Sequence, residues 1–367
     1  MLIAGSGTAS SMTPAMQAEA KAVGRPIGRK AALSFLTLVL VVGLLEGGIR
    51  LAHRVRDGLR GPKVSTTNSA GLFEPNAYLA YVANPANPEH TRDGFRSPHE
   101  VSLAHEGWRI LCLGGSSTYG TRVREADCYP RQLERALAED ASPAPEVLNG
   151  GLGGWSTPNL IGFLALRALD YRPDICLFYV GFNDAWNRLL YADSRADNSN
   201  AQRPWSLPSD VWRHSMVLNL LRFGRTDPDS LHIHKICWNE ESGDPEENWR
   251  TSSFAPFRRN LRTLVAICRA NSIRPILCTQ ATDFEHHPPA ERVELWARAM
   301  EETTREVRAA AEELEVDLID LRTPMSNHEA WFADCLHMNE AGNRERARLI
   351  AEWMRERDCL AGPARRR

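Results

Sequence analysis

The chain has 367 residues, of which 43% are hydrophobic and 25% are charged, a balance typical of a globular protein with a substantial core. Its formal net charge is -2, so the composition argues against a protein that binds nucleic acid through a basic surface. Its eight cysteines follow no spacing typical of a disulfide framework, and they therefore do not indicate a redox compartment.

The N-terminal region combines a polar tail with an apolar segment. Residues 1–30 are small and polar and contain no aromatic residue, so we expect a disordered tail. Residues 31–45 (AALSFLTLVLVVGLL) are almost wholly apolar, and an extension to residue 52 makes the segment long enough to cross a bilayer. This extension includes Glu46 and Arg50, which are four residues apart and can pair on a helix. We expect a single membrane anchor at 31–52; the alternatives are a buried helix of a soluble protein and a cleaved signal peptide.

The charges that flank the apolar segment do not determine its orientation. Four positive side chains precede it and five follow it: Lys21, Arg25, Arg29 and Lys30, then Arg50, Arg54, Arg56, Arg60 and Lys63. The positive-inside rule therefore does not decide the orientation of the segment. Only the order of the elements favours a short inside tail and an exported C-terminal domain. Residues 53–105 are rich in proline, asparagine and glycine, which predicts an extended linker that wraps onto this domain. Within the linker, residues 92–96 predict an ordinary turn, with a substrate-contacting loop as the alternative.

Residues 106–360 alternate short apolar strands with amphipathic helices. We expect strands at 110–113, 146–149, 174–180, 274–279 and 316–321, and helices near 130–139, 157–171, 257–271, 290–314 and 339–355. This alternation predicts an α/β fold: a three-layer α/β/α sandwich with a parallel, doubly wound, flavodoxin-like sheet of strand order 2-1-3-4-5.

An insertion at 185–253 interrupts the alternation and predicts a cap over the active-site edge. It contains five tryptophans: Trp186, Trp205, Trp212, Trp238 and Trp249. Their side chains could form a small satellite core, which we favour, or line a substrate groove. His232, His234 and Cys237 also lie here, but no matching ligand cluster follows them, so we expect neither a metal nor a cofactor.

Polar side chains follow the predicted strands at positions that suit acyl-transfer chemistry. Ser116, Gly154 and Asn183 follow three strands, and the carboxyl ends of parallel strands meet at one edge of a sheet. A serine hydroxyl needs a base within hydrogen-bond reach, and His337 can take its proton while Asp334 orients the imidazole. The backbone N–H groups of Ser116 and Gly154 and the amide of Asn183 can stabilise an oxyanion.

Four segments carry a resemblance to a known family: Gly114-Gly115-Ser116, Asn149-x-x-x-x-Gly154, Gly181-x-Asn183-Asp184 and Asp334-x-x-His337. In this order they resemble the four blocks of the SGNH hydrolases, also called GDSL-type esterases and lipases, over roughly residue 108 to the final helix. The resemblance implies that Ser116 is the nucleophile, that Gly154 and Asn183 are oxyanion donors, and that Asp334 and His337 complete a triad. The tail, the apolar segment and the Gly-Gly-Ser-Ser-Thr block look like the membrane-anchored bacterial branch. In one departure, Gly115 stands where the family's common block has aspartate.

Several assignments have alternatives. Ser117 could replace Ser116 if the turn is shifted by one residue, Asp184 could be taken for the acid, and Cys335 could offer a thiol nucleophile. We expect Asp184 to fix its turn and Cys335 to fill space. Among the other cysteines, we expect three to be buried in strands and three to be the best candidates for exposure: Cys112, Cys176 and Cys278, then Cys128, Cys237 and Cys359.

The leading functional hypothesis is a serine esterase that hydrolyses an acyl or acetyl ester of a carbohydrate, a lipid or a small molecule through an acyl-enzyme on Ser116. An acyltransferase could use the same residues, with a sugar hydroxyl in place of water and a drier site. A non-catalytic carbohydrate-binding module is the third hypothesis, and the presence of every triad and oxyanion residue argues against it.

Overall fold

The computed structural model describes residues 29–60, 71–202, 215–223 and 237–361. The tail expected at 1–30 therefore lies almost entirely outside the described residues. The chain forms two compact units, one of residues 1–62 and 214–227 and the other of residues 63–213 and 228–367. Each unit is described by itself.

The described residues of the smaller unit form the helices α2 (Arg29–Arg60) and α8 (Met216–Phe223). Lys30–Ala52 within α2 has a mean hydropathy of 2.1 and is long and apolar enough to cross a membrane, which confirms the apolar helix expected there. Glu46 is the acidic residue of this stretch, and its carboxylate is fully engaged. It accepts hydrogen bonds from the Arg50 guanidinium, the Ser215 hydroxyl and the first backbone N–H groups of α8.

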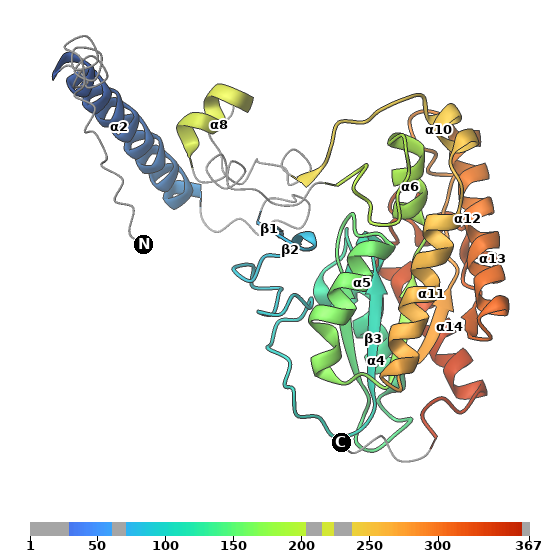
Figure 1. Cartoon of the computed structure of the whole chain (residues 1–367). Coiled ribbons are helices and arrows are strands. Elements are labelled where there is room, and N and C mark those ends of the chain that lie inside the picture. Colours follow the sequence, from blue (N-terminus) through green and yellow to red (C-terminus); the bar gives the residue numbers. More distant parts are fainter. Residues whose placement is uncertain (1–28, 61–70, 203–214, 224–236, 362–367) are drawn as a thin grey trace, which may run out of the picture. The chain divides into compact units, whose positions relative to one another are not determined.

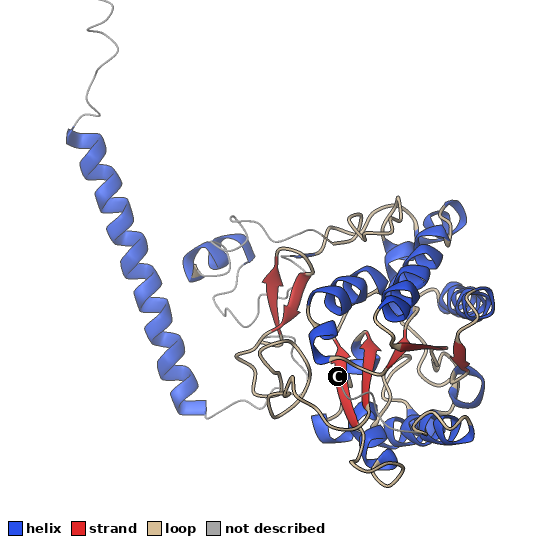
Figure 2. Cartoon of the chain, turned by 60° about the horizontal axis from the view of Figure 1, so that its bottom comes forward, coloured by secondary structure: helices blue, strands red, loops and turns tan. Residues whose placement is uncertain are grey.

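The larger unit is built on a five-stranded sheet in which every neighbouring pair is parallel (Figure 2). The strands lie in the order β4 (Glu146–Gly151), β3 (Arg109–Gly114), β5 (Ile175–Tyr179), β6 (Arg274–Cys278) and β7 (Asp317–Ile319). This confirms the predicted α/β class and the strand order 2-1-3-4-5. All residues of β3 and β5 are buried, as expected for central parallel strands covered on both faces.

The helices form a layer on each face of the sheet because successive strand residues point to opposite sides. Ile110 and Cys112 pack with α4 (Tyr129–Leu137) and α14 (Glu340–Glu356). Leu111 and Leu113 pack with the other layer, which consists of α5 (Thr157–Leu166), α11 (Ala255–Ala270) and α12 (Val293–Glu313) (Figure 1). The shorter elements are α3 (Ser116–Tyr119), η1 (Glu125–Asp127), η2 (Ala168–Tyr171), α6 (Phe182–Leu190), α10 (Pro245–Thr251), α13 (Arg322–Met325) and η4 (Glu329–Trp331).

One expected helix is shorter in the structure. The helix predicted over 157–171 ends at Leu166, because Arg167 leaves the helical conformation, and the separate 3₁₀ turn η2 follows. This turn directs the Tyr171 ring into the core, and the backbone carbonyl of Tyr171 accepts a hydrogen bond from Arg109. Apolar periodicity alone did not reveal this break, because both pieces bury apolar side chains on the same side.

The segment that precedes β3 contributes to the core. It contains an antiparallel hairpin, β1 (Phe73–Asn76) and β2 (Ala80–Ala83), and an irregular stretch that reaches Phe95. Tyr81 and Phe95 are both 0% exposed and belong to the same apolar cluster as α5. Residues far from the sheet in sequence therefore lie directly against the layer that covers it.

The described aromatic residues of the insertion belong to apolar clusters. Trp238 and Trp249 are each 5% exposed, and Trp186 is half-buried against the ring of Trp296. The Arg188 guanidinium lies 3.7 Å above the Trp249 ring. The contacts of Trp186 and Trp249 fit the satellite-core interpretation, whereas Trp238 packs into the main apolar cluster that covers the sheet. Trp205 and Trp212 lie outside the described residues.

Candidate active site

The Ser116 turn begins where β3 ends. Ser116 opens the single helical turn α3, directly after the two glycines that close the strand. A Cβ at Gly114 would lie 2.2 Å from Oγ1 of Thr118, and a Cβ at Gly115 would lie 2.3 Å from Nδ2 of Asn183. Both glycines are therefore needed, because neighbouring side chains occupy the space beside the backbone.

The loop that precedes α14 brings His337 to Ser116. Nε2 of His337 lies 2.8 Å from Oγ of Ser116, and Nδ1 lies 2.9 Å from each carboxylate oxygen of Asp334. Because an ionised carboxylate can only accept, Nδ1 of the neutral imidazole carries the proton, and Nε2 is left as the acceptor that faces the serine hydroxyl. The order of these atoms is the order that general-base activation of a serine requires.

Local hydrogen bonds hold Asp334 in its ionised form. Burial alone would raise the pKa of Asp334, but the hydrogen bond and the charge of His337 lower it, as do the backbone N–H groups of His337 and Leu336. The net effect is a pKa well below the usual range. Arg122 adds a half-exposed ion pair, with 3.3 Å between its Nε and Oδ2 of Asp334. The sequence analysis missed Arg122, because a charged residue in a loop carries no distinguishing spacing.

Asn183 lies in the first turn of α6 with its amide held in place. Its Nδ2 donates to the backbone carbonyl of Trp155 over 2.7 Å, which leaves the second N–H of the amide free to donate elsewhere. Gly154 adopts a φ of +75°, and a Cβ there would lie 2.5 Å from the hydroxyl of Tyr81. Among the described residues, no group accepts a hydrogen bond from the backbone N–H of either Ser116 or Gly154. The structure thus offers three open donors in the segments that flank Ser116.

A buried polar network connects the Gly154 loop to α6. The Thr157 hydroxyl and backbone N–H both donate to Asp184, over 2.5 and 3.1 Å, and Asn260 donates to the Thr157 hydroxyl. Next to it, the Ser156 hydroxyl accepts from Asn187 and Asn198. Burial raises the pKa of Asp184 to about 6. Through these hydrogen bonds, the carboxylate of Asp184 connects the start of α5 to the start of α6. It forms no hydrogen bond with His337.

The hydroxyl of Ser117 and the thiol of Cys335 form no described hydrogen bond with the imidazole of His337. Ser117 is 4% exposed, and its hydroxyl donates to the backbone carbonyl of Leu336 and accepts from the amide of Gln280, each over 3.4 Å. Burial raises the pKa of Cys335 to about 11, so its thiol stays protonated at neutral pH.

The burial of the cysteines differs from expectation at three positions. Cys112, Cys176 and Cys278 are buried as predicted. The exposure expected for Cys128, Cys237 and Cys359 was wrong: all three are buried, because Cys128 faces the end of the Ser116 turn and the other two pack into the apolar clusters. Within the part of the chain that the structure describes, no group of three or more potential metal ligands occurs, and His232 and His234 lie outside it.

This arrangement of serine, glycine, asparagine and histidine at one sheet edge coincides with a family match. Residues 112–345 match the model of the GDSL-like Lipase/Acylhydrolase family. The chain belongs to this family. GDSL-like lipases and acylhydrolases hydrolyse esters, so the chain is an ester-hydrolysing enzyme of the SGNH type. No curated protein matches its sequence.

Solved structures with a similar fold include three bacterial proteins. A lipase/acylhydrolase from Enterococcus faecalis is 19% identical, with 71% of this chain and 100% of that chain covered and a TM-score of 0.44. A putative GDSL-like lipase from Parabacteroides merdae is 16% identical, with coverages of 70% and 98% and a TM-score of 0.44. A variant of an acetyl xylan esterase from Geobacillus stearothermophilus is 18% identical, with coverages of 72% and 100% and a TM-score of 0.42.

Proposed function

We propose that this enzyme is a serine esterase that forms an acyl-enzyme on Ser116. The observation that carries the proposal is the chain of contacts from Oγ of Ser116 through His337 to Asp334, with 2.8 Å between Oγ and Nε2. His337 takes the hydroxyl proton as Oγ attacks the ester carbonyl, and Asp334 stabilises the imidazolium that forms.

The tetrahedral intermediate carries a negative oxygen, which needs preorganised donors. We assign this role to the backbone N–H groups of Ser116 and Gly154 and to the free N–H of Asn183. Collapse of the intermediate breaks the ester C–O bond, and His337 returns its proton to the leaving alcohol. Water then attacks the acyl-enzyme with His337 again as the base, and the carboxylic acid leaves as Oγ regains its proton.

We further propose that α2 is a single-pass anchor and that the catalytic domain is exported. The length and hydropathy of Lys30–Ala52 support an anchor, and so does the pairing of Glu46 with Arg50 and with the start of α8, because an unpaired charge in a bilayer is costly. Cleavage of α2 in cells, detected by the mass of the mature chain, would instead identify a signal peptide. The proposed substrate is an acyl or acetyl ester of a carbohydrate, a lipid or a small molecule.

The two neighbouring serines provide a matched test of the nucleophile. Ser116→Ala should lower the turnover of p-nitrophenyl esters and acetylated sugars by at least about 10⁴-fold, whereas Ser117→Ala should keep most of the activity. Both variants of the full chain are compared in detergent, with a fluorophosphonate probe and peptide mass analysis to locate the labelled serine. Labelling of Ser117, or retained activity in folded Ser116→Ala, would reject the proposed mechanism. Mass analysis of the products distinguishes hydrolysis from transfer to a sugar.

A further inference from the structure

A buried arginine, Arg96, forms hydrogen bonds with the C-terminal end of the helical turn that carries Ser116. The turn α3 is only four residues long, and its C-terminal carbonyls have no helix beyond them to supply donors. Nη1 of Arg96 donates to the carbonyls of Tyr119 and Gly120 over 2.7 and 2.9 Å, and Nη2 donates to the carbonyl of Val123 over 2.9 Å. One guanidinium thus holds three backbone carbonyls at the end of the turn that begins with Ser116.

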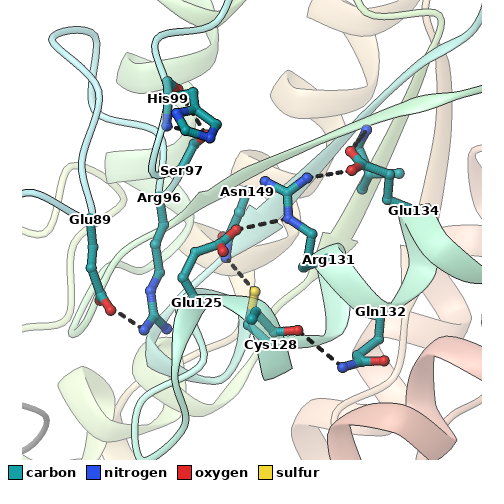
Figure 3. Close-up of polar contacts among 12 residues, drawn as sticks. Glu89, Arg96, Ser97, His99, Glu125, Cys128, Arg131, Gln132, Glu134 and Asn149 are labelled. Atoms are coloured by element: carbon teal, nitrogen blue, oxygen red, sulfur yellow. Dashed lines mark hydrogen bonds and ion pairs between the residues drawn. The ribbon is translucent and has the colours of Figure 1, made fainter.

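The environment of Arg96 leaves it little freedom to move. Its side chain is 3% exposed, and its guanidinium lies 4.3 Å from the centre of the Tyr119 ring. Nη2 also forms a 2.9 Å ion pair with Glu89, the contact drawn in Figure 3. A buried charge is costly unless it is paired and hydrogen-bonded, so the planar fork of the guanidinium stays where these acceptors are.

Two further residues attach to the same turn. Asn149, at the start of the glycine block, donates to the Tyr119 carbonyl over 3.2 Å and to the sulfur of Cys128 (Figure 3). Nε2 of His90 lies 2.9 Å from the Tyr119 hydroxyl. His90 and Arg96 both belong to the irregular segment that precedes β3. Residues of this segment therefore contact Tyr119 at its ring, at its hydroxyl and at its backbone carbonyl.

We propose that Arg96 is a positioning residue for catalysis, an inference that rests on the proposed acyl-enzyme mechanism at Ser116. A single helical turn is not stable by itself, because it fixes several backbone dihedrals for very few hydrogen bonds. Arg96 supplies the missing donors at the far end of α3 and so sets the direction in which Ser116 projects toward His337. A displacement of about 1 Å at a reacting group can cost about 10²-fold in rate.

The chain contains a matched control for this role. Arg109 is 1% exposed, forms an ion pair with Glu146, and donates to the backbone carbonyls of Tyr171 and Ser102. It therefore resembles Arg96 in burial and in bonding. Arg109 lies at the start of β3, however, whereas Ser116 follows the other end of that strand. None of the hydrogen bonds of the Arg109 side chain reaches the Ser116 turn, so replacing Arg109 should perturb the fold without removing a contact of that turn.

The experiment compares Arg96→Lys with Arg109→Lys in the full chain in detergent. Lysine keeps the charge but cannot bond three carbonyls with a planar fork. We expect kcat of Arg96→Lys to fall by about 10²-fold, with KM and the substrate range unchanged, and labelling of Ser116 by fluorophosphonate to slow to the same extent. Arg109→Lys should lower the melting temperature comparably but keep kcat per folded molecule. Equal losses of kcat in the two variants, or losses that follow the folded fraction alone, would overturn the proposal.

Two additional variants keep the test decisive. If Arg96→Lys does not fold, Arg96→Gln removes the buried charge and cannot reach the three carbonyls that the guanidinium bonds, and a kcat equal to that of the wild type would then overturn the proposal. Ser116→Ala separates this inference from the mechanism on which it rests. Activity retained in Ser116→Ala refutes the acyl-enzyme mechanism, whereas loss there together with full activity in folded Arg96→Lys refutes only the positioning role.

Discussion

The amide of Asn183 occupies the space that a side chain at position 115 would need. A Cβ on Gly115 would lie 2.3 Å from Nδ2 of Asn183 and 3.1 Å from the Trp155 carbonyl, the group to which Nδ2 donates. Gly115 directly precedes α3, with a φ of -87° and a ψ of -149°. In this chain, glycine at position 115 lets the Asn183 amide approach the turn that carries Ser116.

We predict that Gly115→Ala disables Asn183 without unfolding the enzyme. The new Cβ should rotate the Asn183 amide away from Trp155 and remove one oxyanion donor, so kcat should fall by about 10²-fold or more. The check is a double-mutant cycle on an activated ester. In the Asn183→Ala background, where the space is clear, Gly115→Ala should have little further effect. Independent, additive losses would contradict the steric explanation.

We predict that Asn183→Ala alone lowers kcat by about 10²–10³-fold and leaves KM nearly unchanged. The reason is that the amide would bond to a charge that exists only in the transition state. Steady-state kinetics with circular dichroism as a fold control measures this effect. A change confined to KM would show that Asn183 binds the substrate instead. The losses from Asn183→Ala and Ser116→Ala should not add, because these residues act as one unit.

We predict that Asp334→Asn lowers kcat by about 10⁴-fold, since an amide can hold His337 in the wrong tautomer. The lowered pKa of Asp334 means that its carboxylate keeps its charge as the pH falls from neutral through the ordinary carboxyl range. Arg122→Gln is the matched control. It removes the half-exposed partner of the same carboxylate, and exposed pairs contribute at most about 1 kcal/mol, so the loss should stay below about fivefold. Comparable losses in the two variants would contradict the role assigned to Asp334.

We predict that Asp184 makes stability depend on pH. Its pKa is raised to about 6 in the folded protein, so between the carboxyl pKa of the unfolded chain, about 3.9, and that value the folded state binds more protons than the unfolded state. The free energy of unfolding should therefore fall as the pH rises through this window, by at most about 1.4 kcal/mol per pH unit. Thermal unfolding of the wild type and of Asp184→Asn across this range measures the effect. A difference between the two that is independent of pH would contradict it.

Local sequence determined the sheet and most of the candidate site. Apolar runs followed by glycine or a small polar residue predicted β3, β4 and β5, and parallel strands bring Ser116, Gly154 and Asn183 to one edge whatever the details of the loops. The part of the site that could not be predicted consists of contacts made across long sequence distances. Arg96 is the clearest example, because residues 92–96 predicted a turn or, as the alternative, a substrate-contacting loop, whereas the fold brings this arginine to the end of α3.

Two Asp-x-x-His segments lie within the described residues, and comparing them separates what the local sequence determines from what the tertiary structure determines. In both Asp283–His286 and Asp334–His337, the carboxylate accepts from the backbone N–H and from Nδ1 of the histidine three residues later. This pairing is local, because a short loop alone places those groups within reach, and the sequence by itself determines it. Only the tertiary structure brings Nε2 of His337 to Ser116, because the Asp334 loop precedes α14, which packs against α4 beside the end of β3. The pairing of acid and base is thus a property of four consecutive residues, and the pairing of base and nucleophile is a property of the folded sheet.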